Sequence, residues 1–109
     1  MAEGLAKVVR QMVGSIAKSL PAMADMPSSD RSAILRVELR RMAKTSEVLL
    51  ERHHVAEPGH LAYVMTLSCD KVIKDALRHA PESFSDGRLA RALHRLCVDF
   101  VEPELKKLQ

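Results

Sequence analysis

Apolar residues recur every three or four positions along most of the chain, which is the spacing of one face of an α-helix. No stretch alternates apolar and polar residues in the manner of a half-buried β-strand. Four segments show the helical spacing, and stretches that contain proline, glycine or serine separate them. The apolar positions that define the segments are Leu5, Val9, Met12, Ile16 and Leu20; Leu35, Leu39, Met42 and Leu49; Ala62, Met65, Cys69, Val72 and Ala76; and Leu89, Leu93, Leu96 and Phe100. The sequence therefore predicts an all-α fold of about four helices.

The residues between the first two segments predict where those helices meet. Pro21 and Pro27 bracket the first connection, and Pro21 is expected to break the first helix because proline cannot donate a helical hydrogen bond. The second helix is expected over about 30–54, with Ser28 or Ser29 as its N-cap.

The last two helices are bounded in the same way. A third helix is expected over about 60–79, where a proline ends it. The fourth begins after an N-cap at Ser85 or Asp86 and runs to Pro103, with the tail adding one further turn. Because the connections are short, consecutive helices should run antiparallel in a small up-down bundle. We expect one helical domain, covering residues 1–109.

The second helix carries apolar residues on more than one side. Its main stripe has the rhythm of a bundle seam, whereas Ile34, Val37, Val48 and Leu50 lie outside that stripe. A helix with two apolar sides needs more than one neighbour, so we expect a homodimer in which the bundle is completed between chains. The residues predicted for this self-association are Leu35, Leu39, Met42 and Leu49.

The stretch ERHHVAEPGH contains the pattern Glu-x-x-His twice, as Glu51 with His54 and Glu57 with His60. Carboxylate and imidazole at this spacing ligate metal in di-iron bundles, where the two pairs come from different helices. Here both pairs lie within ten residues, and Pro58 interrupts the second. The histidines that close the second and third helices, His53, His54 and His79, are better explained by the negative end of the helix dipole. We expect no metal at these residues.

The two cysteines give no stronger indication of chemistry. His94 and Cys97 are three positions apart and could supply two zinc ligands, but a structural zinc site needs four. Cys69 and Cys97 both fall on apolar stripes and are interpreted as small core residues. The chain has no glycine-rich phosphate loop and no nucleophile motif. We therefore expect a protein without cofactor and without enzymatic activity.

Charge is the most suggestive feature of the sequence. There are 17 Lys and Arg against 14 Asp and Glu, which gives a formal charge of only +3. The basic residues form one stripe on each of three helices, with acids interspersed: Arg36, Arg40 and Lys44; Lys71, Lys74 and Arg78; and Arg88, Arg91 and Arg95. Stripes of this kind either face solvent or, where they converge, bind phosphates.

These observations favour a non-catalytic helical bundle that acts as an adaptor or regulator through protein–protein contacts. The alternative is a nucleic-acid-binding regulator that uses the basic faces, although three aromatic residues are too few for a base-stacking platform. The residues predicted to bind a partner of either kind are Arg36, Arg40, Lys44, Arg88, Arg91 and Arg95. Because the first 20 residues lack an apolar signal core and no run could span a membrane, we expect a cytoplasmic protein without membrane contact.

Overall fold

The structure, a computed structural model, describes residues 2–108 as helices joined by short connections. The elements in chain order are α1 (Ala2–Ala24), α2 (Ser28–Arg52), α3 (Pro58–His79), η1 (Pro81–Phe84) and α4 (Arg88–Lys107). No β-strand occurs within the described range, and the predicted all-α fold is confirmed. None of the described helices is long and apolar enough to span a bilayer.

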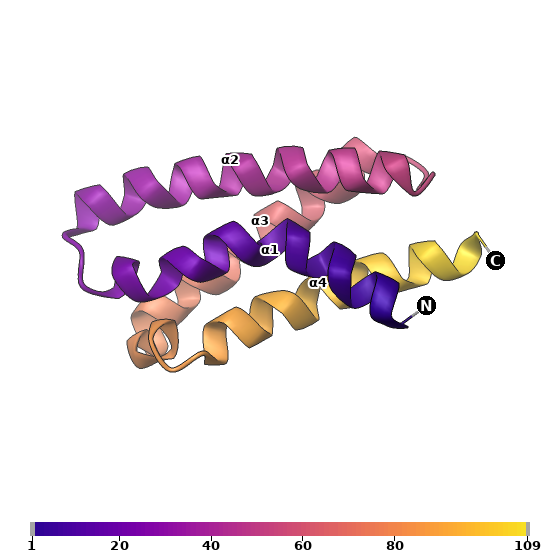
Figure 1. Cartoon of the computed structure of the whole chain (residues 1–109). Helices are drawn as coiled ribbons and strands as arrows, with labels where there is room; N and C mark the ends of the chain where they lie inside the picture. The colour runs from indigo at the N-terminus through magenta and orange to yellow at the C-terminus, as the bar shows by residue number, and fades with distance from the viewer. Residues whose placement is uncertain (1, 109) are drawn as a thin grey trace.

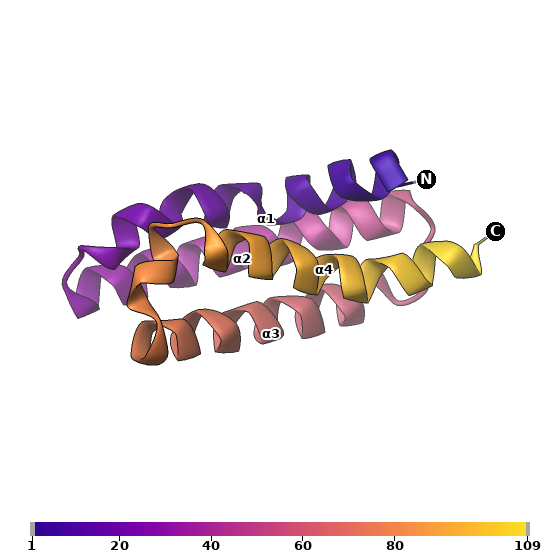
Figure 2. The ribbon, with the colours of Figure 1, turned by 90° about the horizontal axis from the view of Figure 1, so that it is seen from below.

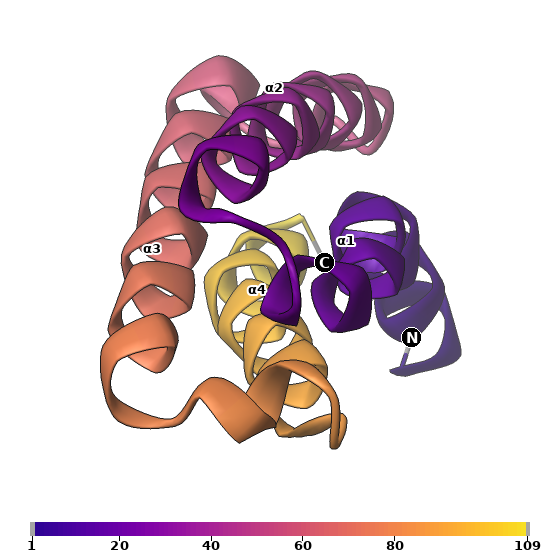
Figure 3. The ribbon, with the colours of Figure 1, turned by 90° about the vertical axis from the view of Figure 1, so that its left-hand side faces the viewer.

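The four long helices form the predicted up-down bundle, in which each helix runs antiparallel to the next (Figures 1 and 2). Helix α1 packs against α2 and α4, and α3 packs against the same two helices. The diagonal pairs, α1 with α3 and α2 with α4, make no contact between described residues. The bundle measures 45 × 22 × 18 Å, and Figure 3 shows its cross-section seen along the helices. Each helix therefore keeps one face toward solvent, and the outer faces of α2 and α4 point in opposite directions.

Aliphatic side chains from all four helices fill the bundle at the expected stripes. The fully buried side chains come mostly from α1, α3 and α4 and include Val9, Ile16, Leu20, Met23, Met65, Ile73, Leu93 and Val101. Two residues outside the long helices are also buried in this core. Val55, in the connection between α2 and α3, is one of them, and Phe84 of η1 is the other. Because η1 packs against α1, α3 and α4, Phe84 closes the end of the bundle where α3 leads into α4.

Two helices extend through prolines that were expected to end or nearly end them. Pro21 lies inside α1, which continues to Ala24, so the prediction of a break at Pro21 is wrong. Pro103 lies inside α4, which continues through the predicted extra turn to Lys107. A proline this near a helix end removes only one hydrogen bond. Burial of Met23 in the core offsets that loss for α1.

The helix starts also differ from the prediction. Helix α2 begins at Ser28 itself, with Pro27 in the N-cap position and no side-chain cap, so neither serine is the N-cap. Gly87, rather than Ser85 or Asp86, occupies the N-cap of α4, at a φ of +89° that favours glycine. The Asp86 carboxylate nevertheless accepts the backbone N–H of Arg88 at 2.9 Å, and so it satisfies one of the free donors at the helix start.

A polar contact joins α1 to α2 at one edge of the apolar core. The Ser15 hydroxyl donates a hydrogen bond of 2.6 Å to the buried carboxylate of Glu38. Arg41, one turn further along α2, donates to Glu38 at 3.2 Å and to the Ser15 oxygen at 3.0 Å. The buried carboxylate is thus held by two donors, one of which is charged, as a buried charge requires.

Candidate functional site

The basic residues predicted to bind a partner are all exposed, but they do not form one surface. The stripe that begins at Arg36 lies on α2, and the stripe that begins at Arg88 lies on α4, the diagonal helix. Their outer faces therefore point away from each other. The stripe of α3, which begins at Lys71, lies on a helix that packs directly against α2. The structure therefore brings Arg36 of the α2 stripe beside the α3 stripe and leaves the α4 stripe on the opposite side.

Two of the three arginines in the α4 stripe, Arg88 and Arg95, are paired with carboxylates, whereas Arg91 forms no ion pair within the described residues. The Arg88 Nε lies 2.7 Å from an Asp86 oxygen, and its Nη2 lies 3.3 Å from Glu82. The backbone N–H of Arg88, followed by its guanidinium, lowers the pKa of Asp86. About two turns further on, Arg95 lies 3.6 Å from Asp99. This face has the composition of an ordinary solvated helix surface.

Two hollows, of about 250 and 160 Å³, lie in the seam between α2 and α3. A third hollow, of about 330 Å³, adjoins them on the outer face of α3 and is lined by α3 residues alone, and Asp70 lines all three. We call this surface the α2–α3 groove. The residues that define it are Arg36, Leu39 and Ala43 on α2, and Tyr63, Leu67, Asp70, Lys71, Lys74 and Arg78 on α3.

One end of the groove is apolar and open to solvent. Tyr63 is 61% exposed and Leu67 is 53% exposed, and the two lie one turn apart on α3. Across the seam, the half-buried side chains of Leu39 and Ala43 complete the smallest hollow. Between them, the Thr66 hydroxyl donates to the Ala62 carbonyl at 2.7 Å and is therefore already satisfied. This end offers a partner mainly apolar surface.

The other end of the groove carries an excess of positive charge. Four cations line it, Arg36, Lys71, Lys74 and Arg78, against the two carboxylates Asp70 and Asp75. The only ion pair among these six in the described structure joins Lys74 to Asp70 at 3.1 Å. The remaining three cations form no ion pair with any described residue, unlike Arg88 and Arg95 of α4.

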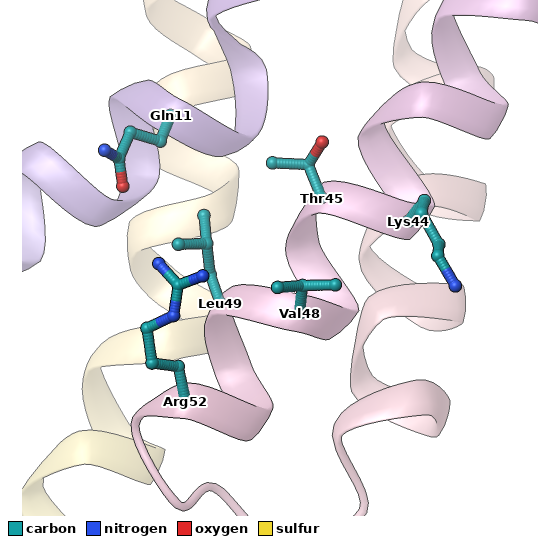
Figure 4. A pocket seen from close by; sticks show the side chains of 6 residues that line it. All are labelled: Gln11, Lys44, Thr45, Val48, Leu49 and Arg52. Atoms are coloured by element: carbon teal, nitrogen blue, oxygen red, sulfur yellow. The ribbon is translucent and has the colours of Figure 1, made fainter.

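A separate hollow, between α1 and α2, is lined in part by Lys44 of the α2 stripe, whereas Arg40 is exposed and lines none of these hollows. Its volume is about 380 Å³, and Lys44, Val48 and Arg52 are among the residues that line it. Figure 4 shows Arg52 reaching back beside Leu49, while the Lys44 side chain points away from the other lining residues. Lys44 borders the hollow between α1 and α2, and Arg36 lines a hollow between α2 and α3. The predicted stripe is divided between two surfaces.

Three of the four residues predicted for self-association lie in the core of the chain itself. Leu35, Met42 and Leu49 are buried, because they form the inner stripe that packs on the neighbouring helices. Their assignment to an interface between chains stays a prediction, although burial within the chain leaves them little surface for a partner. Leu39 is half-buried and lines the groove. Self-association itself stays a prediction.

The cysteines are core residues, as predicted. Cys69 and Cys97 are fully buried, and their sulfur atoms lie 3.9 Å apart. The contact with Cys69, together with burial, raises the pKa of the Cys97 thiol far above its usual range, so this thiol is neutral at physiological pH.

The Glu-x-x-His residues are dispersed over the surface. All four are exposed: Glu51 in the last turn of α2, His54 and Glu57 in the connection that follows, and His60 in the first turn of α3. Among the described residues, no three His, Cys, Asp or Glu side chains are close enough to hold a metal ion.

Sequence reasoning missed the apolar end of the groove. Tyr63 was noted only as one of three aromatic residues, and Leu67 was not singled out. A signal for both was present, because they are spaced one turn apart and fall outside the core stripe that contains Ala62, Met65 and Cys69. Two apolar residues on the polar side of an amphipathic helix indicate a surface with a partner.

The groove offers non-covalent binding, with apolar surface at one end and ammonium and guanidinium donors at the other.

Comparison of the chain with models of protein families, with curated proteins and with solved structures gave no match.

Proposed function

We propose that this chain is a non-catalytic interaction module that binds another protein through the α2–α3 groove and so acts as an adaptor or regulator. The observation that carries the proposal is the joint exposure of Tyr63 and Leu67 beside cations that lack an ion-pair partner in the described structure. Tyrosine and arginine are over-represented among the residues that dominate protein interfaces. A contiguous apolar strip that remains open to water costs free energy, which a partner recovers by covering it.

Binding of nucleic acid is the second candidate, and the observation in its favour is that Arg36 of the α2 stripe lies beside the α3 stripe. The apolar end of the groove has no role in it, because phosphates gain nothing from contact with leucine. Arg88 and Arg95 are neutralised on the opposite face and add little to a phosphate-binding surface. Protein binding uses both ends of the groove and is therefore the better account.

Site-specific photo-crosslinking in the native cell tests the proposal. Benzoylphenylalanine in place of Tyr63 preserves an exposed aromatic ring, and the same residue in place of Arg95 on α4 is the matched control. We expect a discrete covalent protein adduct from position 63 and none from position 95. The adduct should be lost when Leu67→Ser is added, while circular dichroism shows an unchanged helical fold.

Each other result has a defined meaning. A nucleic-acid adduct at position 63 would replace the proposal with the second candidate. Equal adducts at positions 63 and 95, or no adduct at position 63, would overturn the proposal.

A further inference from the structure

The two ends of the α2–α3 groove differ in chemistry, and they are ordered along the helix axes. On α3 the apolar residues Tyr63 and Leu67 come first, and the cations Lys71, Lys74 and Arg78 follow. On α2, which runs the opposite way, Ala43 and Leu39 face the apolar end and Arg36 faces the basic end. The groove therefore has a direction that an occupant must match.

We infer that the occupant is an amphipathic α-helix of another protein, with apolar side chains at one end and acidic side chains at the other. This inference rests on the proposed function and specifies its partner. The apolar side chains lie against Tyr63, Leu67 and Leu39, and the acidic side chains lie against Arg36, Lys71 and Arg78.

The shape of the surface favours a helix. The apolar part of the groove and Arg36 lie in the seam between two antiparallel helices, and the basic end continues onto the exposed face of α3. A third helix fits such a seam by placing side chains at i, i+3, i+4 and i+7 into it. Positions 63 to 78 of α3 span about 22 Å at 1.5 Å per residue, which is the length of a partner helix of about four turns. An extended segment would need an exposed strand edge, and the described residues form no strand.

The charge of the groove requires an acidic partner. Four cations against two carboxylates leave two positive charges in excess, and only Lys74 has an ion pair in the described structure. Opposite charges on a partner would speed its approach and fix its register. A neutral helix would leave these cations partly desolvated without a partner, which opposes binding.

A second copy of this chain does not satisfy these conditions. Two copies that meet groove to groove are related by a two-fold axis lying in the interface. An axis along the groove would set one basic end on the other, and an axis across it would set a basic end on an apolar end. Both arrangements oppose association through this face, so the partner is a different protein.

Designed peptides provide the test. The first probe is a fluorescein-labelled helical peptide of about 15 residues with leucines at i and i+4 in one half and glutamates at the same spacing in the other. The second probe has lysine in place of every glutamate. We expect saturable binding of the glutamate peptide to the intact chain by fluorescence anisotropy, and binding at least about tenfold weaker for the lysine peptide.

Substitutions on exposed positions locate the site. Lys71→Glu and Arg36→Glu should each weaken the glutamate peptide several-fold and together improve binding of the lysine peptide, whereas Leu67→Ser should weaken both peptides. Arg95→Glu is a close control for Lys71→Glu, because each places a glutamate four residues before an aspartate on an outer helix face, at Asp99 and Asp75. It should leave the affinity for both peptides unchanged.

Four results would overturn the inference: equal affinity for the two peptides, equal losses with Lys71→Glu and Arg95→Glu, tighter binding of duplex DNA than of the glutamate peptide, or no binding of either peptide up to about 1 mM. The last result is compatible with a protein adduct at position 63. Failure of this inference is thereby distinguished from failure of the proposed function.

Discussion

The outer face of α4 and the α2–α3 groove share the same sequence pattern and differ in their surroundings. Both carry basic residues at helical spacing. On α4, Arg88 and Arg95 are paired with carboxylates, and within α4 no large apolar side chain is exposed. In the groove, three of four cations lack an ion pair in the described structure, and Tyr63 and Leu67 are exposed beside them. The side chains around a basic stripe thus decide whether it can bind a partner. The groove is the face on which partner binding is expected.

The largest expected effect on stability distinguishes the two sides of α3, the side buried in the core and the side that faces the groove. Ile73 is fully buried, so Ile73→Ala should lower the free energy of unfolding by about 2–5 kcal/mol through lost burial and a residual cavity. Leu67 lies on the groove side and is half exposed, so Leu67→Ala should change the free energy of unfolding by less than about 0.5 kcal/mol. Urea unfolding followed by circular dichroism measures both. A loss of 2 kcal/mol or more for Leu67→Ala would mean that this side chain supports the fold and is not free for a partner.

A smaller effect is expected at the start of α4. Gly87 has a φ of +89°, and a Cβ there would lie 3.0 Å from an Arg91 nitrogen, so Gly87→Ala should destabilise the chain by roughly 1–2 kcal/mol. Gly14, inside α1, has nothing within 4 Å of an added Cβ, and Gly14→Ala should stabilise by about 0.5–1 kcal/mol. Thermal unfolding of the two variants should therefore give shifts of opposite sign. Shifts of the same sign would show that the backbone at Gly87 does not hold the start of α4.

The smallest expected effect on stability comes from the ion pair between Arg88 and Asp86. The pKa of Asp86 is lowered by the backbone N–H and guanidinium of Arg88, so the ionised form is favoured in the folded state. Its contribution to stability is present above the unfolded pKa of about 3.9 and is lost as the pH falls through the lower folded pKa. Thermal midpoints of the native chain and Asp86→Asn should differ slightly at pH 6 and converge near pH 2. A difference that stays constant over this range would contradict the assignment.

The sequence was sufficient to predict the four helices and their antiparallel order, because each core stripe extends over several turns. It was not sufficient to place their ends. At Pro21 burial of Met23 outweighs the hydrogen bond that proline removes, and sequence spacing alone does not show how deeply Met23 is buried. At the start of α4 the expected N-cap, Asp86, does accept a hydrogen bond from the backbone N–H of Arg88. The left-handed Gly87, however, lies between Asp86 and the helix.

The candidate site was predicted only in part, and the missing part depends on tertiary contacts. Arg36 and Arg88 were both predicted to bind a partner, and only the fold shows that they face opposite directions. The pairing of Arg88 with Glu82 depends on the short helix η1, which the sequence pattern did not predict. For self-association, Leu35 and Met42 were chosen for their spacing, but the same spacing is what buries them within the chain.

The hydrogen bond between Ser15 and Glu38 also bears on how the chain selects one structure among close competitors. Aliphatic stripes are nearly periodic, so α1 displaced along α2 by one turn would still bury much of its apolar area. That displacement would move the Ser15 hydroxyl about 5.4 Å from the Glu38 carboxylate and leave a buried anion with one donor fewer. The contact between Ser15 and Glu38 thus adds a penalty for displacement to that of the apolar stripes, and it favours the observed axial alignment of the first two helices.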